Sequence, residues 1–183
     1  TEPIAVALCT ARAAETLGGE PEKITVRLSA NILKNAMGVG IPGTGMIGLP
    51  IAVALGALVG RSEYQLEVLR DVTPEAVARA RDYLAADAVS VALKEGISET
   101  LYVEVHCTAG GRRAEAVIAG SHTRFVYLAC DGEVVLDRRT GASSREEERC
   151  VPLTLRRVFD YALTAPIDEL AFIDEARRLN MAA

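Results

Sequence analysis

The chain has 183 residues and a net charge of −5; half of its residues are hydrophobic, only 4% are aromatic, and none is tryptophan. This length is enough for one substantial domain, with a core built from Ala, Val, Leu and Ile. The acidic balance, without a basic cluster that has interleaved aromatic residues, argues against nucleic-acid binding. No secretory leader pattern occurs at the start, and we expect a cytoplasmic protein.

The first elements are a helix and a strand. Residues 2–17 are predicted to form a helix, because Thr1 can cap it and Pro3 lies in the first turn, where its missing N–H costs nothing. Residues 23–30 alternate between apolar and polar side chains, which is typical of a half-buried strand.

An almost entirely apolar stretch follows at residues 36–60, with Thr44 as its only polar side chain. A membrane span needs about 20 apolar residues without helix breakers. The first half of this stretch is interrupted by prolines and glycines, and only residues 50–60 are uninterrupted. We therefore expect a buried core helix there and no membrane span.

The middle of the chain predicts a second helix and then a run of strands. The helix lies within residues 71–88, with Thr73 as its N-cap and Pro74 in its first position. Short connections, among them an Asp131-Gly132 turn signal, predict that the strands are antiparallel neighbours. These strands are expected at residues 89–93, 101–107, 113–120, 124–130 and 133–138.

The last part predicts a surface loop and two helices. Residues 138–149 are strongly polar and are expected to form the loop, and residues 152–163 and 166–179 are expected to be helical. Together these elements predict an α+β fold with a mostly antiparallel sheet packed with helices, as a single domain over residues 1–183.

The cysteines do not predict a metal site. No two have the C-x-x-C spacing, and the chain has only two histidines, so a zinc site built from this chain alone is not expected. We expect free packing thiols without disulfides at all four positions, which are Cys9, Cys107, Cys130 and Cys150.

The first candidate site is residues 29–45, expected to be a glycine-rich loop between the first strand and the apolar helix. Glycines let a backbone approach a ligand closely, and N–H groups at a helix start favour an anion. Lys34 adds a positive charge, and Asn31 and Asn35 can orient a carboxylate or an amine. The loop matches neither a Walker A loop nor a complete dinucleotide fingerprint. The pattern alone fits a ligand loop and a loop that only permits packing equally well.

The second candidate is the Gly-Ser-His-Thr run at residues 120–123, at a junction between strands. A lone histidine is more often structural than functional. His106 alternates with the apolar residues of its strand, so we expect it on the outer face. The carboxylate of Glu2 interacts favourably with the dipole at the start of the first helix. No nucleophile elbow motif occurs in the chain.

Three stretches together resemble the amino-terminal half of the L-cysteine desulfidase family, which belongs with the iron–sulfur L-serine dehydratases. They are TEPIAVAL at residues 1–8, the N-x-x-K-N … P-G-T-G-M-x-G-L-P-I-A motif within residues 29–58, and Gly-Ser-His-Thr at residues 120–123. The similarity extends through most of the chain, including residues 66–84.

The resemblance implies a lyase that β-eliminates L-cysteine or L-serine to pyruvate and ammonia, with sulfide or water as the other product. A [4Fe–4S] cluster, one iron of which acts as a Lewis acid, replaces pyridoxal phosphate in that family. There, a ligand cysteine directly precedes the TEP triplet, and the other ligands lie in a carboxy-terminal helical domain. The chain is thus expected to be a fragment of a longer two-domain enzyme, without a cluster or activity by itself.

The resemblance also assigns residues to the site, although it identifies no catalytic residue. The expected task of this domain is to hold the carboxylate of a small L-amino acid against the carboxy-terminal cluster domain, and a homo-oligomer is compatible with this. An alternative is a regulatory module that binds a small anion or amino acid without catalysis, and a third reading is a purely structural domain. The substrate-binding residues implied are Asn31, Lys34, Asn35, Thr44 and Gly45, then His122 and Thr123, with Thr1 and Glu2 beside the missing cysteine.

Overall fold

The computed structural model describes residues 1–139 and 154–182. The chain divides into two compact units, Thr1–Gly141 and Ala142–Ala183. The α+β class and the mostly antiparallel sheet are confirmed in the first unit. The sequence predicted a single domain over residues 1–183, whereas in the structure the sheet belongs to a first unit that ends at Gly141.

The first unit is built on a six-stranded sheet with the order β4-β1-β5-β6-β7-β8. Every neighbouring pair is antiparallel except β1 and β4, which run parallel. The strands are β1 (Lys23–Leu28), β4 (Val89–Leu93), β5 (Tyr102–Ala109), β6 (Arg112–Ala119), β7 (Phe125–Cys130) and β8 (Glu133–Asp137).

The prediction that β4 is an antiparallel neighbour of β5 is wrong, because β1 lies between them. The segment between β1 and β4 contains helices, and such a crossover brings the chain back parallel to the strand that it left. The short connection from β4 to β5 therefore passes over one strand instead of making a hairpin.

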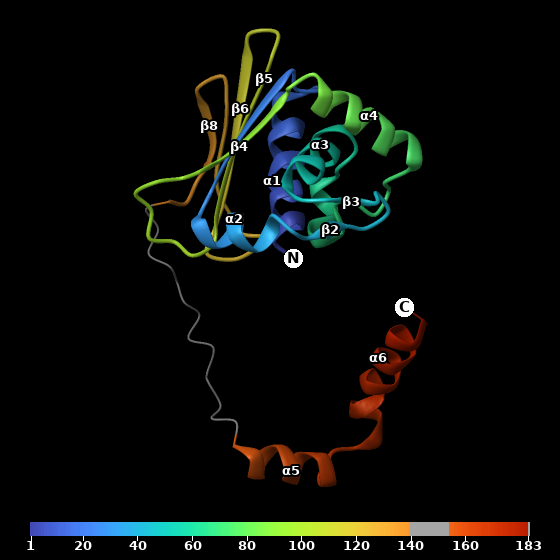
Figure 1. Cartoon of the computed structure of the whole chain (residues 1–183). Helices are drawn as coiled ribbons and strands as arrows, with labels where there is room; N and C mark the ends of the chain where they lie inside the picture. The colour runs from blue at the N-terminus through green and yellow to red at the C-terminus, as the bar shows by residue number, and fades with distance from the viewer. Residues whose placement is uncertain (140–153, 183) are drawn as a thin grey trace. The chain divides into compact units, whose positions relative to one another are not determined.

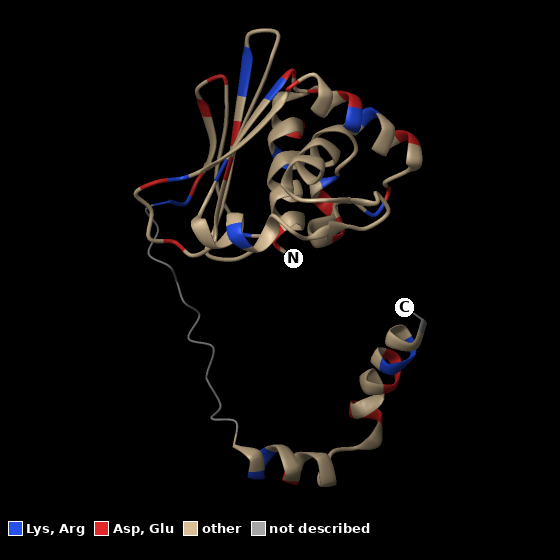
Figure 2. Cartoon of the chain, viewed as in Figure 1, with Lys and Arg blue, Asp and Glu red and all other residues tan. Residues whose placement is uncertain are grey.

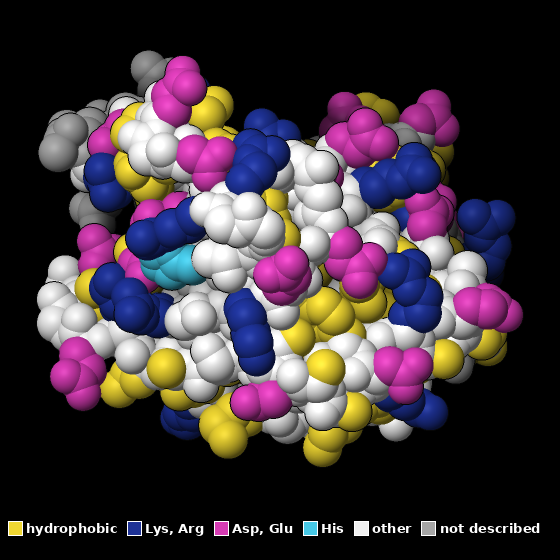
Figure 3. All heavy atoms as spheres, turned by 90° about the horizontal axis from the view of Figure 1, so that it is seen from above, with side chains coloured by type: hydrophobic (Ala, Val, Ile, Leu, Met, Phe, Trp, Pro, Cys, Tyr) yellow, Lys and Arg dark blue, Asp and Glu magenta, His cyan; other side chains and the backbone are white. Residues whose placement is uncertain are grey.

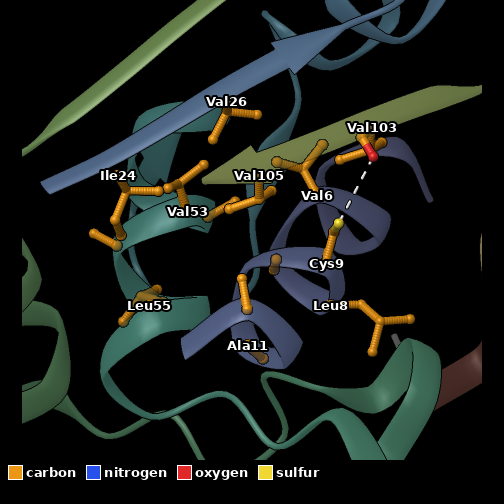
Figure 4. Packing of buried hydrophobic residues seen from close by; sticks show 14 of the residues in the cluster. Val6, Leu8, Cys9, Ala11, Ile24, Val26, Val53, Leu55, Val103 and Val105 are labelled. Carbon is orange, nitrogen blue, oxygen red and sulfur yellow. Dashed lines mark hydrogen bonds between the residues drawn. The ribbon is translucent and has the colours of Figure 1, made fainter. Parts of the chain in front are cut away.

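Helices cover one face of the sheet, and no described element of this unit covers the other (Figure 1). Helix α1 (Glu2–Leu17) packs on β5, β6 and β7, and α3 (Leu49–Leu58) packs against α1 and α4 (Pro74–Ala85). Figure 4 shows side chains of α1, α3, β1 and β5 meeting in the core. The core is almost entirely aliphatic, as the composition predicts.

The two central helices approach each other through small residues. A Cβ atom built on Gly56 of α3 would lie 2.5 Å from the carbonyl oxygen of Ala7 in α1, and one on Gly60 would lie 2.9 Å from the Cβ of Ala11. Gly60, just after the end of α3, thus meets a residue later in α1 than Gly56 does, so the two helices run parallel. The predicted core helix within residues 50–60 is confirmed as α3.

The prediction of a loop over residues 29–45 is wrong. Residues Ala30–Ala36 form helix α2, and the side chain of Ser29 caps it by accepting from the N–H of Ile32. The buried Ile32 and Ala36 are four residues apart and lie on one side of this helix. The glycines that follow form a small hairpin of β2 (Gly40–Ile41) and β3 (Met46–Ile47).

The remaining helices agree with the sequence patterns. Thr73 caps α4 as predicted, and a 3-10 helix, η1 (Ser62–Glu67), precedes it. In the second unit, α5 (Leu155–Thr164), η2 (Ile167–Leu170) and α6 (Ala171–Ala182) form where two helices were expected. Most of the predicted polar loop lies outside the described residues. None of the described helices is both long and apolar enough to cross a bilayer.

Candidate functional site at one end of the sheet

Two of the expected site segments leave the sheet at the same end. Leu28, at the end of β1, lies opposite Val103 of β5, and Val103 lies opposite Ile118 of β6. The chain leaves β1 into α2 and leaves β6 into the turn at residues 120–123. Helix α2 and the Gly-Ser-His-Thr turn therefore belong to one end of the first unit.

The helices α1 and α3 also begin at this end. Gly18, just after α1, lies beside Arg112 of the β5–β6 hairpin, which marks the opposite end of the sheet. Because α3 runs parallel to α1, Thr1 and Gly48 at their starts lie at the end that carries α2. Figure 1 shows the N-terminus, α2 and β2 at this end of the unit.

The polar side chains of α2 are exposed at this end. Asn35 donates from Nδ2 to Oδ1 of Asn31 at 3.4 Å, and the ammonium group of Lys34 has no partner among the described residues. Asn31 also lines a cavity of about 440 Å³ between the start of α2 and residues 93–100. These three side chains are free to meet a ligand that arrives from solvent.

The hydroxyl group of Thr44 is used inside the hairpin. It donates to the carbonyl of Ile41 at 2.7 Å and accepts from the N–H of Met46 at 2.9 Å, and its side chain is buried. Gly45 next to it is exposed, with a φ of 64° that favours glycine. Thr44 therefore shapes the turn, and the backbone at Gly45 is the part presented to a ligand.

Glu2, His122 and Thr123 are partly exposed near the start of α1. Accepting a hydrogen bond from its own backbone N–H lowers the pKa of the Glu2 carboxyl, and the N-terminal ammonium group, 3.4 Å away, lowers it further. The turn at residues 120–123 follows β6 at the end of the sheet where α1 begins. The structure thus places α2, the turn at residues 120–123 and the start of α1 at one end of the unit. The hairpin tip with Thr44 and Gly45 lies against α4, where Arg81 donates to the carbonyl of Thr44.

Two of the three described cysteines, Cys9 and Cys107, do not fit an iron–sulfur cluster. Cys9 donates to the backbone carbonyls of Ala116 and Val103, and burial raises its pKa well above the ordinary value. Burial also raises the pKa of Cys107 to about 12. Cluster ligands are thiolates, whereas both of these groups are held as buried thiols.

A second polar cluster, missed in the sequence, lies on the open face of the sheet. The carboxylate of Glu104 is 6% exposed and accepts from Lys94 at 2.8 Å, Tyr102 at 2.7 Å and Arg27 at 3.2 Å. The Nε2 atom of His106 lies 2.9 Å from the same carboxylate. These donors lower the pKa of Glu104 far below its ordinary value, with His106 as the largest cause.

Glu104, His106 and Glu115 are close enough to share a cation. The carboxylate of Glu104 is already neutralised by Lys94 and Arg27, so a metal ion would have to displace two positive charges. His106 lies on the outer face of β5, as predicted. Glu104 is two residues before His106 on the same strand, so the same alternation would have predicted that Glu104 lies on the outer face as well.

The chain is similar along its whole length to longer bacterial proteins. It is 64% identical over 183 residues to a UPF0597 protein of Bacteroides thetaiotaomicron. The matched region is the whole of this chain and 43% of that relative. UPF0597 proteins of Porphyromonas gingivalis and Photobacterium profundum are 45% and 42% identical over 98% of this chain. No family model matches the chain. No solved structure matches it either. The chain therefore spans less than half the length of the curated relatives that it matches.

Proposed function

We propose that this chain is the substrate-holding part of an iron–sulfur-dependent lyase that β-eliminates L-cysteine or L-serine in the cytoplasm. The observation that supports this is the convergence of α2, the turn at residues 120–123 and the starts of α1 and α3 at one end of the sheet. Four segments far apart in the sequence contribute polar groups there, as a site for a small amino acid requires.

In this proposal, the exposed ammonium group of Lys34 pairs with the substrate carboxylate. Asn31 and Asn35 flank Lys34 on α2 and offer amide donors and acceptors that orient the substrate. The exposed backbone at Gly45 allows a close approach on the neighbouring hairpin. Lys34 accordingly contributes to binding rather than to the proton transfer.

Cys9 and Cys107 do not fit the cluster, so we place it in the part of the longer protein that this chain does not span. The relatives extend beyond the chain by more than half of their length, which leaves room for such a domain. This chain then forms one wall of the site, and the carboxy-terminal domain forms the other.

The test is an anaerobic assay of pyruvate release by the full-length, cluster-loaded protein with L-cysteine and with L-serine. Because Lys34 is assigned to binding, we expect Lys34→Ala to raise KM about tenfold or more and to change kcat much less. Arg79→Ala is the matched control, because Arg79 is an exposed cation on α4 that pairs with Glu20.

Either of two outcomes would contradict the proposal. Pyruvate release from neither substrate by a loaded protein would exclude the lyase and favour the regulatory module that binds a small anion or amino acid. Unchanged kcat and KM in Lys34→Ala would remove the carboxylate assignment while leaving the lyase in place.

A further inference from the structure

The open face of the sheet carries an ordered array of polar side chains. Alternate residues of β1, β5 and β6 point away from the helices, and the strand register places them in rows across the three strands. The rows are Lys23–Thr108–Arg113, Thr25–His106–Glu115 and Arg27–Glu104–Val117. The first row lies toward the β5–β6 hairpin, at the end of the sheet opposite to α2.

This face is hollowed across all three rows. A cavity of about 240 Å³ is lined by Thr25, Arg27, His106, Thr108 and Arg113. Figure 3 shows a histidine side chain lying among Lys and Arg side chains on the surface. Every side chain that lines the hollow carries a hydrogen-bond donor, and none carries a carboxylate.

The two arginines keep unused donors. Arg27 spends one N–H on Glu104, and Arg113 uses Nη2 toward Nδ1 of His106 at 3.1 Å and, more weakly, toward Glu115 at 3.8 Å. A guanidinium group has five N–H donors, so several on each arginine have no partner among the described residues. The hydroxyl group of Thr108 has none there either.

The open face of β1, β5 and β6 carries more cations than carboxylates, although the whole chain is acidic. The side chains that rise from β1, β5 and β6, together with Lys94 after β4, comprise four cations and two carboxylates, and both carboxylates are already paired. These six groups together carry two more positive than negative charges. The next carboxylate is Asp131, which accepts from the backbone N–H of Arg113 and pairs with Arg112. Figure 2 shows charged residues along these strands, whereas α3 on the covered side has none.

We propose that this hollow binds a small phosphate dianion, as free phosphate or as the phosphate group of a small monoester. A dianion matches the two excess positive charges. A tetrahedral oxyanion has enough oxygens to accept from Arg27, Arg113 and a threonine hydroxyl at once, whereas a carboxylate has two. The site is separate from the substrate-holding end and does not depend on the proposed lyase activity.

The test is calorimetric titration of the full chain with inorganic phosphate and, separately, with glycerol 3-phosphate, at constant ionic strength. Arg27→Gln and Arg113→Gln are each expected to weaken binding about tenfold, because each removes charge-assisted hydrogen bonds. Thr108→Val, which changes no charge and no buried contact, is expected to weaken it several-fold. Tighter binding of the monoester would identify a phosphorylated metabolite as the ligand, and tighter binding of inorganic phosphate would identify the free ion.

Arg112→Gln is the matched control, because Arg112 adjoins Arg113 but pairs with Asp131 on the other side of the strand. Its phosphate affinity is expected to stay within twofold of the wild type. Equal weakening by Arg112→Gln would show general electrostatic attraction and overturn the proposal. The absence of saturable binding of either probe up to about 20 mM would overturn it as well.

Discussion

The two faces of the six-stranded sheet are stabilised by different interactions. The covered face meets α1 and α3 through aliphatic side chains packed so closely that glycine is required at Gly56. The open face has no covering helix among the described residues and is ordered instead by hydrogen bonds around Glu104. Stability thus comes from shape on one face and from charge on the other, so substitutions on the two faces have different signatures.

The largest effect is expected on the covered face. Gly56→Ala places a Cβ 2.5 Å from the backbone oxygen of Ala7, and neither helix can shift without disturbing the core. We expect a loss of about 3 kcal/mol in the free energy of unfolding, measured by urea denaturation. Gly19→Ala is the control, because nothing lies within 4 Å of its added Cβ. Equal stability of the two variants would contradict the close approach of α1 and α3.

A smaller effect is expected on the open face. Glu104→Gln keeps the shape of the side chain but removes the charge that Lys94 and Arg27 neutralise. We expect a loss of about 2 kcal/mol at pH 7, below the cost of a fully buried pair, because Arg27 is half-exposed. The exposed Glu133, changed to Gln, serves as the control and should lose less than about 0.5 kcal/mol.

The loss in Glu104→Gln should depend on pH. The pKa of Glu104 is lower in the folded protein than the value of about 4.3 in an unfolded chain. The stability that this carboxylate contributes is therefore complete above about pH 4.3 and is lost as the pH falls toward the folded pKa. Urea denaturation at pH 6 and at pH 3 should show the gap between wild type and Glu104→Gln closing. A gap that does not change with pH would remove the electrostatic explanation.

The smallest effect is a difference in labelling rate between cysteines, which is measured on the unaltered protein and involves no change in stability. Cys9 and Cys107 are fully buried on the covered side, and burial raises the pKa of both, whereas Cys130 is partly exposed. Iodoacetamide at pH 8 should label Cys130 about 100-fold faster than Cys9 or Cys107. Mass spectrometry of the labelled peptides measures this. Rapid labelling of Cys107 would show that the helices leave the sheet at low cost.

Local patterns predicted the elements well but not all of their neighbours. The alternation at residues 101–107 placed Val103 and Val105 in the core and His106 outside, and Thr73 identified the start of α4. The position of β4 beside β1 was missed, because strand order depends on the crossover and not on the length of one loop. Helix α2 was not predicted, because it is short and the glycines that follow it indicated a loop over the whole of residues 29–45.

For the candidate site, the sequence by itself determined the residue types: an amide–lysine–amide run, a glycine hairpin and a Ser-His-Thr turn. Only the tertiary structure decided that the lysine run and the Ser-His-Thr turn lie at the same end of the sheet, because this depends on strand register. The same holds for the open face, where Arg27, His106 and Arg113 line one hollow although they are far apart in the sequence. The chemistry of each side chain follows from the residue type alone, whereas the distance between two such side chains depends on how the whole sheet is paired and packed.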